Sequence, residues 1–293
     1  MPDPTAPVAA RLEISLWRRT ADHLATLFAV STVIIVLAPL AAIFAYLVIK
    51  GVGSVNWAFL TQTPKPPGEV GGGMANAIAG SVLILTIGSL LGVPLGIGAG
   101  IYLAEFGRNR FGDTVRFVSD VLNGVPSIVI GIVAYALVVL RQKHFSALAG
   151  GVALAIMMVP TITRTTEEML LLVPNTLREA AYGLGIPRWR TMFSITLRTA
   201  TSGVITGVML AFARVAGETA PLLFTAFGNQ YWNWRLDQPT AALPLQIFTY
   251  AISPYDDWHR QAWAGALVLI VLIVSAVAAV RFVVRRGTLG GVD

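Results

Sequence analysis

Long apolar runs separated by short polar segments dominate this chain and indicate its fold. Most runs hold about 20 residues, and a helix of that length, rising about 1.5 Å per residue, crosses the hydrocarbon core of a bilayer. The expected spans are residues 24–49, 77–103, 121–140, 147–163, 202–223 and 263–284. The pattern therefore predicts an all-α integral membrane protein with about six transmembrane helices.

The polar segments divide the rest of the chain. Residues 1–23 form the start, 50–76 an outer loop rich in Pro and Gly, and 285–293 a tail, which leaves 77–284 as one core with five spans. The first run is longer than the apolar part of a signal peptide, about 7 to 15 residues, so we expect an uncleaved anchor. Residues 243–252 are apolar but too short to cross. They form either a half-inserted helix or a pad for an extracytoplasmic partner.

Positive charges favour one side of the predicted bundle. With both termini in the cytoplasm, the inner segments hold 14 Lys and Arg residues and the outer segments hold six. This bias follows the positive-inside rule and places residues 175–197 on the cytoplasmic side. The net charge of +6 is thus spread among the spans instead of forming a face for nucleic acid. Thiolate metal sites are excluded because the chain has no cysteine.

A basic polar interruption, residues 175–197, separates two of the apolar runs. Thr176 and Glu179 have the spacing of a capping box, in which each side chain accepts a hydrogen bond from a backbone N–H at a helix start. Gly183 and Gly185 suit the left-handed backbone that ends a helix, and the proline that follows suits the first turn of a second helix. We therefore expect a helix, a tight turn and a second helix. By itself this pattern also fits an ordinary amphipathic surface helix joining two spans.

The second expected span carries a glycine at every fourth position. These residues are Gly88, Gly92, Gly96 and Gly100. The spacing puts them on one helix face, where small residues let another membrane helix approach closely. We expect a packing ridge, with a kink at Pro94.

The third expected span is interrupted near its start. Asn123, Gly124, Pro126 and Ser127 lie in its opening sequence LNGVPSIVIG. A broken membrane helix is tolerated where protein or a water-filled cavity covers the freed backbone groups. The break marks either a cavity or a simple kink.

One arginine, Arg214, lies inside the fifth expected span. An arginine at the bilayer centre costs about 2.5 to 3.5 kcal/mol, so it should face the bundle interior or a wet path. Glu218 follows four residues later, on the same face if the helix continues, and can pair with it. The guanidinium suits a tetrahedral oxyanion in transit. The alternative is a buried ion pair that only fixes helix register.

Residues 175–197 also resemble a known loop. Bacterial ABC importer permeases carry an EAA loop, a cytoplasmic coupling helix that seats in a cleft of the ATPase subunit. The matching positions are Glu179, Ala180, Ala181, Gly185, Ile195 and Leu197. Arg198 stands where that family usually has a proline. The resemblance implies that the small residues allow close contact with an ATPase.

A longer resemblance covers about residues 71–284. The segments GGGMANAIAGS, PLGIGAGIYLAEF, GVPSIVIG, ARVAGETAPLLFTAFGNQ and LPLQIFTYAISP are similar to those of A-type permeases from phosphate-specific ABC importers. Thr219 and the two residues after it distinguish this type from its C-type partner. The resemblance implies a type I importer (MetI-like) bundle. It also places Arg214 and Glu218 on the substrate path, and we add Thr219, Asn123 and Ser127 to that path.

The same resemblance implies a complex in a bacterial inner membrane. Its other members would be a second, homologous permease, two P-loop ATPases and an extracytoplasmic phosphate-binding protein. No lysine here belongs to a GxxxxGK[ST] phosphate loop, so ATP and Mg²⁺ would bind the ATPases, and we expect no cofactor or metal on this chain.

Three alternatives remain at this stage. A similar permease would import sulfate, molybdate or phosphonate. A motor-free anion channel or carrier would need no coupling helix. An intramembrane enzyme has little support, because the chain contains no HExxH motif, no Ser or Cys nucleophile motif and only three scattered histidines.

Overall fold

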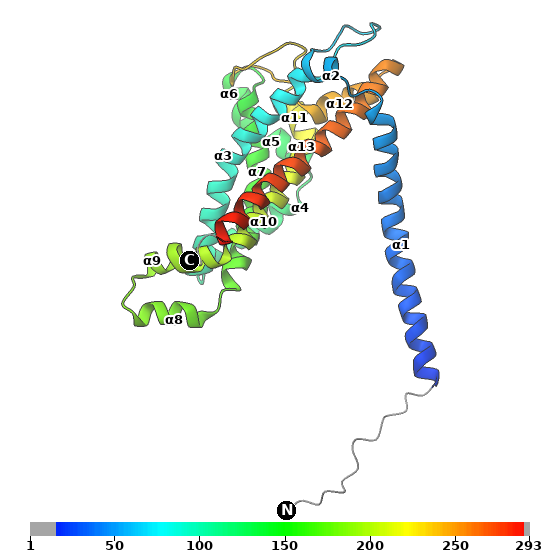
Figure 1. The fold of residues 1–293 in the computed structure, drawn as a ribbon. Helices are drawn as coiled ribbons and strands as arrows, with labels where there is room; N and C mark the ends of the chain where they lie inside the picture. The colour runs from blue at the N-terminus through cyan, green and yellow to red at the C-terminus, as the bar shows by residue number, and fades with distance from the viewer. Residues whose placement is uncertain (1–15, 290–293) are drawn as a thin grey trace, which may run out of the picture. The chain divides into compact units, whose positions relative to one another are not determined.

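The computed structural model describes residues 16–289 and consists of helices joined by turns and loops (Figure 1). Residues 1–15 and 290–293, which hold part of the predicted start and tail, lie outside the described residues. The chain divides into two compact units, residues 1–49 and 50–293, and each is described by itself. In the first unit, most of helix α1 (Leu16–Val52) forms a single apolar rod long enough to cross a membrane.

Long apolar helices also form the second unit. They are α3 (Ala75–Phe106), α7 (Ala147–Leu171), a continuous stretch Arg188–Ala216, and α13 (Asp256–Leu289). With α1, the described residues contain five candidate spans. A sixth exists if α4 (Arg110–Gly124) and the stretch Ser127–Gln142, which bend by 109° at their junction, count as one broken span. The prediction of an all-α protein with about six spans is confirmed.

The broken span is more complex than the predicted interruption. After the break come α5 (Ser127–Ala134), a π-helical segment (Tyr135–Val139) and α6 (Leu140–Gln142). Pro126 at the junction disfavours helical backbone in the residue before it, and Val125 is indeed extended. Much of the segment between the second and third expected spans is thus helix α4, and the expected span 121–140 begins inside that helix.

The fifth span differs from the expected range 202–223 at both ends. It begins with α9 (Arg188–Thr191), continues through a π-helical segment (Met192–Thr196), and ends with α10 (Leu197–Ala216). The second half of the polar interruption therefore belongs to this membrane helix. A separate short helix, α11 (Ala220–Thr225), follows after Gly217.

The centre of the second unit is the contact between α3 and α7. Gly88, Gly92, Gly96 and Gly100 are all buried, and their faces meet α7 residues that are also spaced by four. A Cβ atom added at Gly96 would lie 2.7 Å from Cβ of Ile162, closer than real Cβ atoms approach. The absence of side chains at these positions thus lets α3 and α7 pack backbone against backbone.

Loops and short helices cover the end of the unit at which α3 begins, here named the loop end. They include α2 (Trp57–Thr61) and α12 (Leu243–Ala251). Leu243 and Tyr250 of α12 are buried, and the Leu243 N–H donates to Ser81 Oγ of α3 at 2.6 Å. The start of the short apolar segment 243–252 and Tyr250 therefore pack in the core of their own chain, whereas Phe248 and Ile252 are exposed.

Candidate functional site

The end of the unit opposite the loop end, where α3 and α7 finish, is here named the coupling end. It carries α8 (Asn175–Gly183), the first helix of the predicted helix-turn-helix (Figure 1). The capping-box prediction is wrong, because Pro174 is the N-cap and no side chain caps the helix. The helix starts earlier than expected, so Thr176 lies within its first turn.

The turn after α8 is a Schellman motif. Gly185 has φ +75°, as predicted for the residue that ends the helix, whereas Gly183 is still helical. The Gly185 N–H donates to the Tyr182 carbonyl at 2.9 Å, and the Ile186 N–H donates to the Ala181 carbonyl at 3.1 Å. These two bonds satisfy carbonyls left open at the helix end and fix the direction in which the chain enters the fifth span.

The four coupling residues named from the sequence do not share one environment. Glu179, Ala180 and Gly185 are exposed, and Ala181 is buried at 2% exposure. The expectation that both alanines allow close contact with a partner is therefore corrected for Ala181, whose small size lets α8 pack against its own chain. Ala180 and Gly185 remain accessible.

Arg178 anchors α8 to the ends of two spans. Its Nη1 lies 3.2 Å from Oε1 of Glu105, in the last turn of α3, and its Nη2 donates to the Leu170 carbonyl of α7 at 2.9 Å. Both charged side chains are about 15% exposed, which limits screening by solvent. Because the ion pair and the hydrogen bond involve two different helices, α8 is held to α3 and α7 together.

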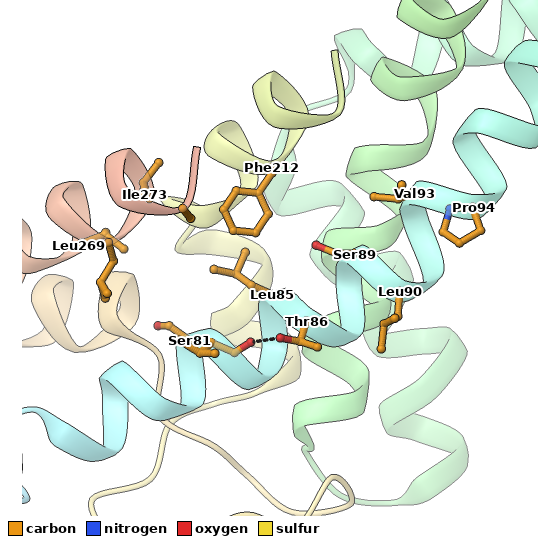
Figure 2. Close-up of a pocket in the computed structure, with 13 residues that line it drawn as sticks. Ser81, Leu85, Thr86, Ser89, Leu90, Val93, Pro94, Phe212, Leu269 and Ile273 are labelled. Atoms are coloured by element: carbon orange, nitrogen blue, oxygen red, sulfur yellow. Dashed lines mark hydrogen bonds between the residues drawn. The ribbon is translucent and has the colours of Figure 1, made fainter. Parts of the chain in front are cut away.

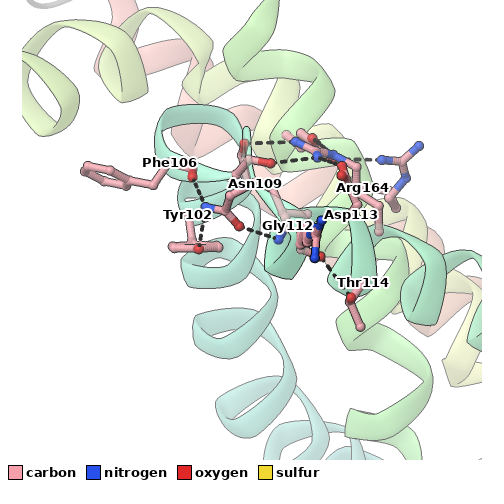
Figure 3. A network of polar contacts seen from close by, with 12 residues as sticks. Tyr102, Phe106, Asn109, Gly112, Asp113, Thr114 and Arg164 are labelled. Carbon is pink, nitrogen blue, oxygen red and sulfur yellow. Dashed lines mark hydrogen bonds and ion pairs between the residues drawn. The ribbon is translucent and has the colours of Figure 1, made fainter.

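A second polar network joins α3, α4 and α7 beside this anchor (Figure 3). Glu167, 3% exposed, accepts from Arg116 Nε at 2.6 Å and from Arg164 Nη1 at 2.8 Å. Arg116 also donates to the Gly107 carbonyl just after α3 ends, and Arg164 pairs with Asp120 at 3.1 Å. A carboxylate buried this deeply is tolerated because two guanidinium groups compensate its charge.

This network was not predicted from the sequence, although Arg116 and Arg164 are among the 14 Lys and Arg residues of the expected inner segments. Arg116 and Glu167 are 51 positions apart, and they meet only because α4 packs alongside α7. The available signal was Glu167 itself, an acidic residue near the end of a long apolar run, since a carboxylate held among membrane spans requires a cationic partner.

Arg214 lies near the end of α10, at the level of the middle of α3 and α7. Gly203 of α10 faces Met169 of α7, and Gly207 faces Thr165, so the two helices are antiparallel. Continuing that register places Arg214 level with Met158, near the middle of α7. The Arg214 side chain is exposed on the surface of the chain.

The pairing of Arg214 with Glu218 is not formed in the described structure. Helix α10 ends at Ala216, so Glu218 lies beyond the helix and not one turn further along it. Among the described residues, no ion pair joins these two side chains. The alternative of a buried, register-fixing pair is therefore wrong, since one partner is exposed and the helix between them is broken.

The other three residues assigned to the path lie at breaks in the helices. Asn123 precedes the bend between α4 and α5, and its Oδ1 accepts from Thr161 Oγ1 at 2.9 Å. Ser127 opens α5, and Thr219 contacts the Pro244 carbonyl at 3.5 Å. Within the described part of the chain, no hydrogen bond or ion pair joins any two of the five path residues.

An apolar groove of about 590 Å³ lies between α3, α10 and α13 (Figure 2). Phe212, Leu269 and Ile273 face it, and Ser89 and Thr86 are among its few polar groups. None of the five path residues lines it. Because it offers no charge, it does not suit an oxyanion. Within the described residues, no group of three or more His, Cys, Asp or Glu side chains could hold a metal ion.

The fold is that of a multi-spanning membrane protein with a short helix, α8, held against the ends of two spans at the coupling end. Residues 92–288 match the family described as binding-protein-dependent transport system inner membrane component. The phosphate transport system permease protein PstA of Yersinia pestis is 46% identical over 94% of this chain and 95% of the relative. PstA of Haemophilus influenzae is 46% identical over 88% of this chain and 92% of the relative. PstA of Mycobacterium leprae is 37% identical over 93% of this chain and 92% of the relative.

The chain therefore belongs to the inner membrane components of binding-protein-dependent transport systems, in the group of permeases represented by these PstA proteins. A chain of the inward-facing MetNI methionine ABC transporter superposes with a TM-score of 0.56 and 17% identity, covering 73% of this chain and 94% of that one. At this identity the likeness shows the fold, and it confirms the predicted MetI-like bundle.

Proposed function

We propose that this chain is the membrane-spanning subunit of an ATP-driven importer that moves inorganic phosphate into the cytoplasm. The relatives that cover nearly the whole chain are phosphate transport permeases by name. The structural observation that supports the proposal best is Arg214, an exposed guanidinium at the level of the middle of α3 and α7. It needs water or a partner subunit beside it, because facing lipid there would cost about 2.5 to 3.5 kcal/mol.

The exposed position of Arg214 supports a path at the surface between two permeases. We propose that a second, homologous permease covers this face and that a water-filled cavity lies between the two subunits. Phosphate released from an extracytoplasmic binding protein would pass Arg214, whose planar fork of donors matches the oxygens of the anion. Glu218, Thr219, Asn123 and Ser127 would contact the same cavity from the neighbouring helix breaks.

The coupling end supports a link to two separate ATPases that bind ATP and Mg²⁺. We propose that Glu179, Ala180 and Gly185 contact the ATPase and that both chain termini lie on the same cytoplasmic side. Because Arg178 fixes α8 to α3 and α7, a pull on α8 would move these two spans as well. Closure of the ATPase pair would thus rock the spans and switch the side to which the cavity opens.

The path assignment is tested by phosphate uptake in vesicles holding the complete importer. Arg214→Leu should lower uptake about 10- to 100-fold, because a charge-assisted hydrogen bond to the anion contributes about 1.5 to 3 kcal/mol. Arg198→Leu is the matched control, an exposed arginine near the other end of the same helix. Unchanged uptake by an assembled Arg214→Leu complex would refute the path.

The remaining alternatives are separated in the same vesicles. Competition by sulfate, molybdate or phosphonate in place of phosphate would identify a different oxyanion. Uptake without ATP would indicate a channel or carrier. Mass spectrometry of what co-purifies with the tagged chain tests the partners, and recovery of a homo-oligomer without an ATPase would refute the complex.

A further inference from the structure

A groove of about 450 Å³ lies at the coupling end, between the last turns of α3, helix α8 and the start of the fifth span. Its floor is apolar and includes Ile101, Ala104 and Met192. Ala104 and Met192 are 8% and 5% exposed and belong to a buried cluster that continues along the spans. The volume is within the range of about 300 to 1,000 Å³ that small ligands occupy.

Two arginines on this groove have no partner in the described residues. Arg108 follows α3 and Arg188 opens the fifth span, both side chains are exposed, and neither makes an ion pair or hydrogen bond there. Arg178 also lines the groove, but Glu105 compensates it. Glu179 adds one negative charge, so the lining carries three arginines against two glutamates, a net charge of +1.

Large aromatic side chains surround the same groove. Phe106, Trp189 and Phe193 are 59%, 67% and 58% exposed, and Tyr182 is 41% exposed. All except Tyr182 stand where a membrane-crossing helix begins or ends. Such aromatic residues, together with arginines, are typical of the boundary between the acyl chains and the headgroups of a bilayer.

We propose that this groove binds an anionic phospholipid. The headgroup phosphate accepts hydrogen bonds from Arg108 and Arg188, and the acyl chains lie along the apolar floor. Basic pockets between membrane helices bind phosphate-bearing headgroups in this way. A free phosphate ion would gain nothing from the apolar floor or the aromatic rim. This site is separate from the proposed transport path and does not rest on the transported anion being phosphate, but it shares Glu179 with the proposed ATPase contact.

The test uses Trp189 as a probe within the purified complete importer. The complex is reconstituted in phosphatidylcholine vesicles with an increasing fraction of phosphatidylglycerol whose acyl chains are brominated, since bromine quenches nearby indoles. The fluorescence of Trp189 is obtained as the difference between the tryptophan fluorescence of the parent complex and that of the Trp189→Phe complex. We expect this signal to be quenched at a lower fraction of brominated lipid when the headgroup is anionic than when the brominated lipid is phosphatidylcholine.

The double variant Arg108→Gln with Arg188→Gln should bind the anionic lipid about 25-fold more weakly, because each arginine contributes about fivefold near a charged surface. The matched control is Arg190→Gln with Arg198→Gln, which removes two exposed arginines nearby that do not line the groove. Its quenching curve should be unchanged.

Three outcomes would overturn the proposal. Equal quenching by the two brominated lipids would show that the groove does not select anionic headgroups. Relief of quenching by added inorganic phosphate would assign the arginines to a free anion. Loss of the ATPase subunits from the double variant, with quenching by the anionic lipid unchanged, would make the groove an ATPase contact.

Discussion

The close packing of α3 on α7 predicts opposite effects for two neighbouring glycines of α3. A Cβ atom at Gly100 would lie 2.5 Å from Cβ of Thr166 and 2.7 Å from the Thr163 carbonyl oxygen. Neither is the end of a flexible side chain, so the helices themselves would have to move apart. A Cβ atom at Gly98, half a turn away, would meet nothing within 4 Å. Both glycines are helical, so the gain in helix propensity on changing either to alanine is the same.

The expected changes in unfolding free energy follow from the cost of overpacking and the gain in helix propensity. Overpacking costs about 1 to 3 kcal/mol, and the contacts at Gly100 put it at the upper end, whereas Gly to Ala in a helix gains about 1 kcal/mol. Gly100→Ala should therefore lose about 2 kcal/mol and Gly98→Ala should gain up to about 1 kcal/mol, a difference of about 3 kcal/mol. The assay is unfolding of the purified complex in mixed micelles, followed by helical circular dichroism. Equal midpoints for the two variants would refute the claim that the glycine face sets the distance between α3 and α7.

Three further predictions concern the coupling end and the loop end. Gly185→Ala should destabilise the turn by about 1 to 2 kcal/mol, because the φ of Gly185 is +75°, and should lower phosphate-stimulated ATPase activity. Gly183→Ala should leave this activity unchanged, because Gly183 is helical and a Cβ atom there meets nothing within 4 Å. Equal activities of the two variants would contradict the prediction. Ser81→Ala should cost about 1 to 3 kcal/mol of unfolding free energy by leaving a buried N–H without its acceptor, and Thr86→Val, which loses only a hydroxyl bonded within its own helix, should cost less. Glu167→Gln should lower the free energy of unfolding by about 3 kcal/mol. This is the lower end of the cost of breaking a buried ion pair, because the two arginine partners are 26% and 29% exposed. An unchanged thermal midpoint would show that the network contributes no stability.

Features set by local sequence were predictable, and those set by distant contacts were not. The span number and the left-handed Gly185 depend on hydrophobicity and on backbone freedom at single positions. The start of the fifth span was missed because Arg188 and Arg190 make its first turn polar. The range of the third span was misjudged because apolar content does not reveal a bend of 109°. The ion pair of Arg116 with Glu167 required knowledge of how α4 packs on α7.

The predicted pairing of Arg214 with Glu218 on the candidate path also failed because local spacing does not reveal where a helix ends. From spacing alone, Arg214 and Glu218 fall on one helical face. The helix stops at Ala216, and Gly217 then separates the two side chains. A glycine and a following proline signalled weakness at this place, but spacing arguments assume a regular helix and fail where the helix ends.

The continuous fifth span joins the two sites that the proposed mechanism requires. It has 29 residues, Arg188 to Ala216, and extends about 43 Å at 1.5 Å per residue. One end follows the fixed turn at Gly185, and Arg214 lies two residues before the other end. A displacement of α8 would pass through that turn into this helix, and no further loop lies between the turn and Arg214. The π-helical segment Met192–Thr196 is the irregular part of this connection, and extra backbone freedom there would absorb movement before it reached Arg214. Coupling through this helix thus requires the segment to keep its geometry while α3 and α7, which Arg178 ties to the same α8, move with it.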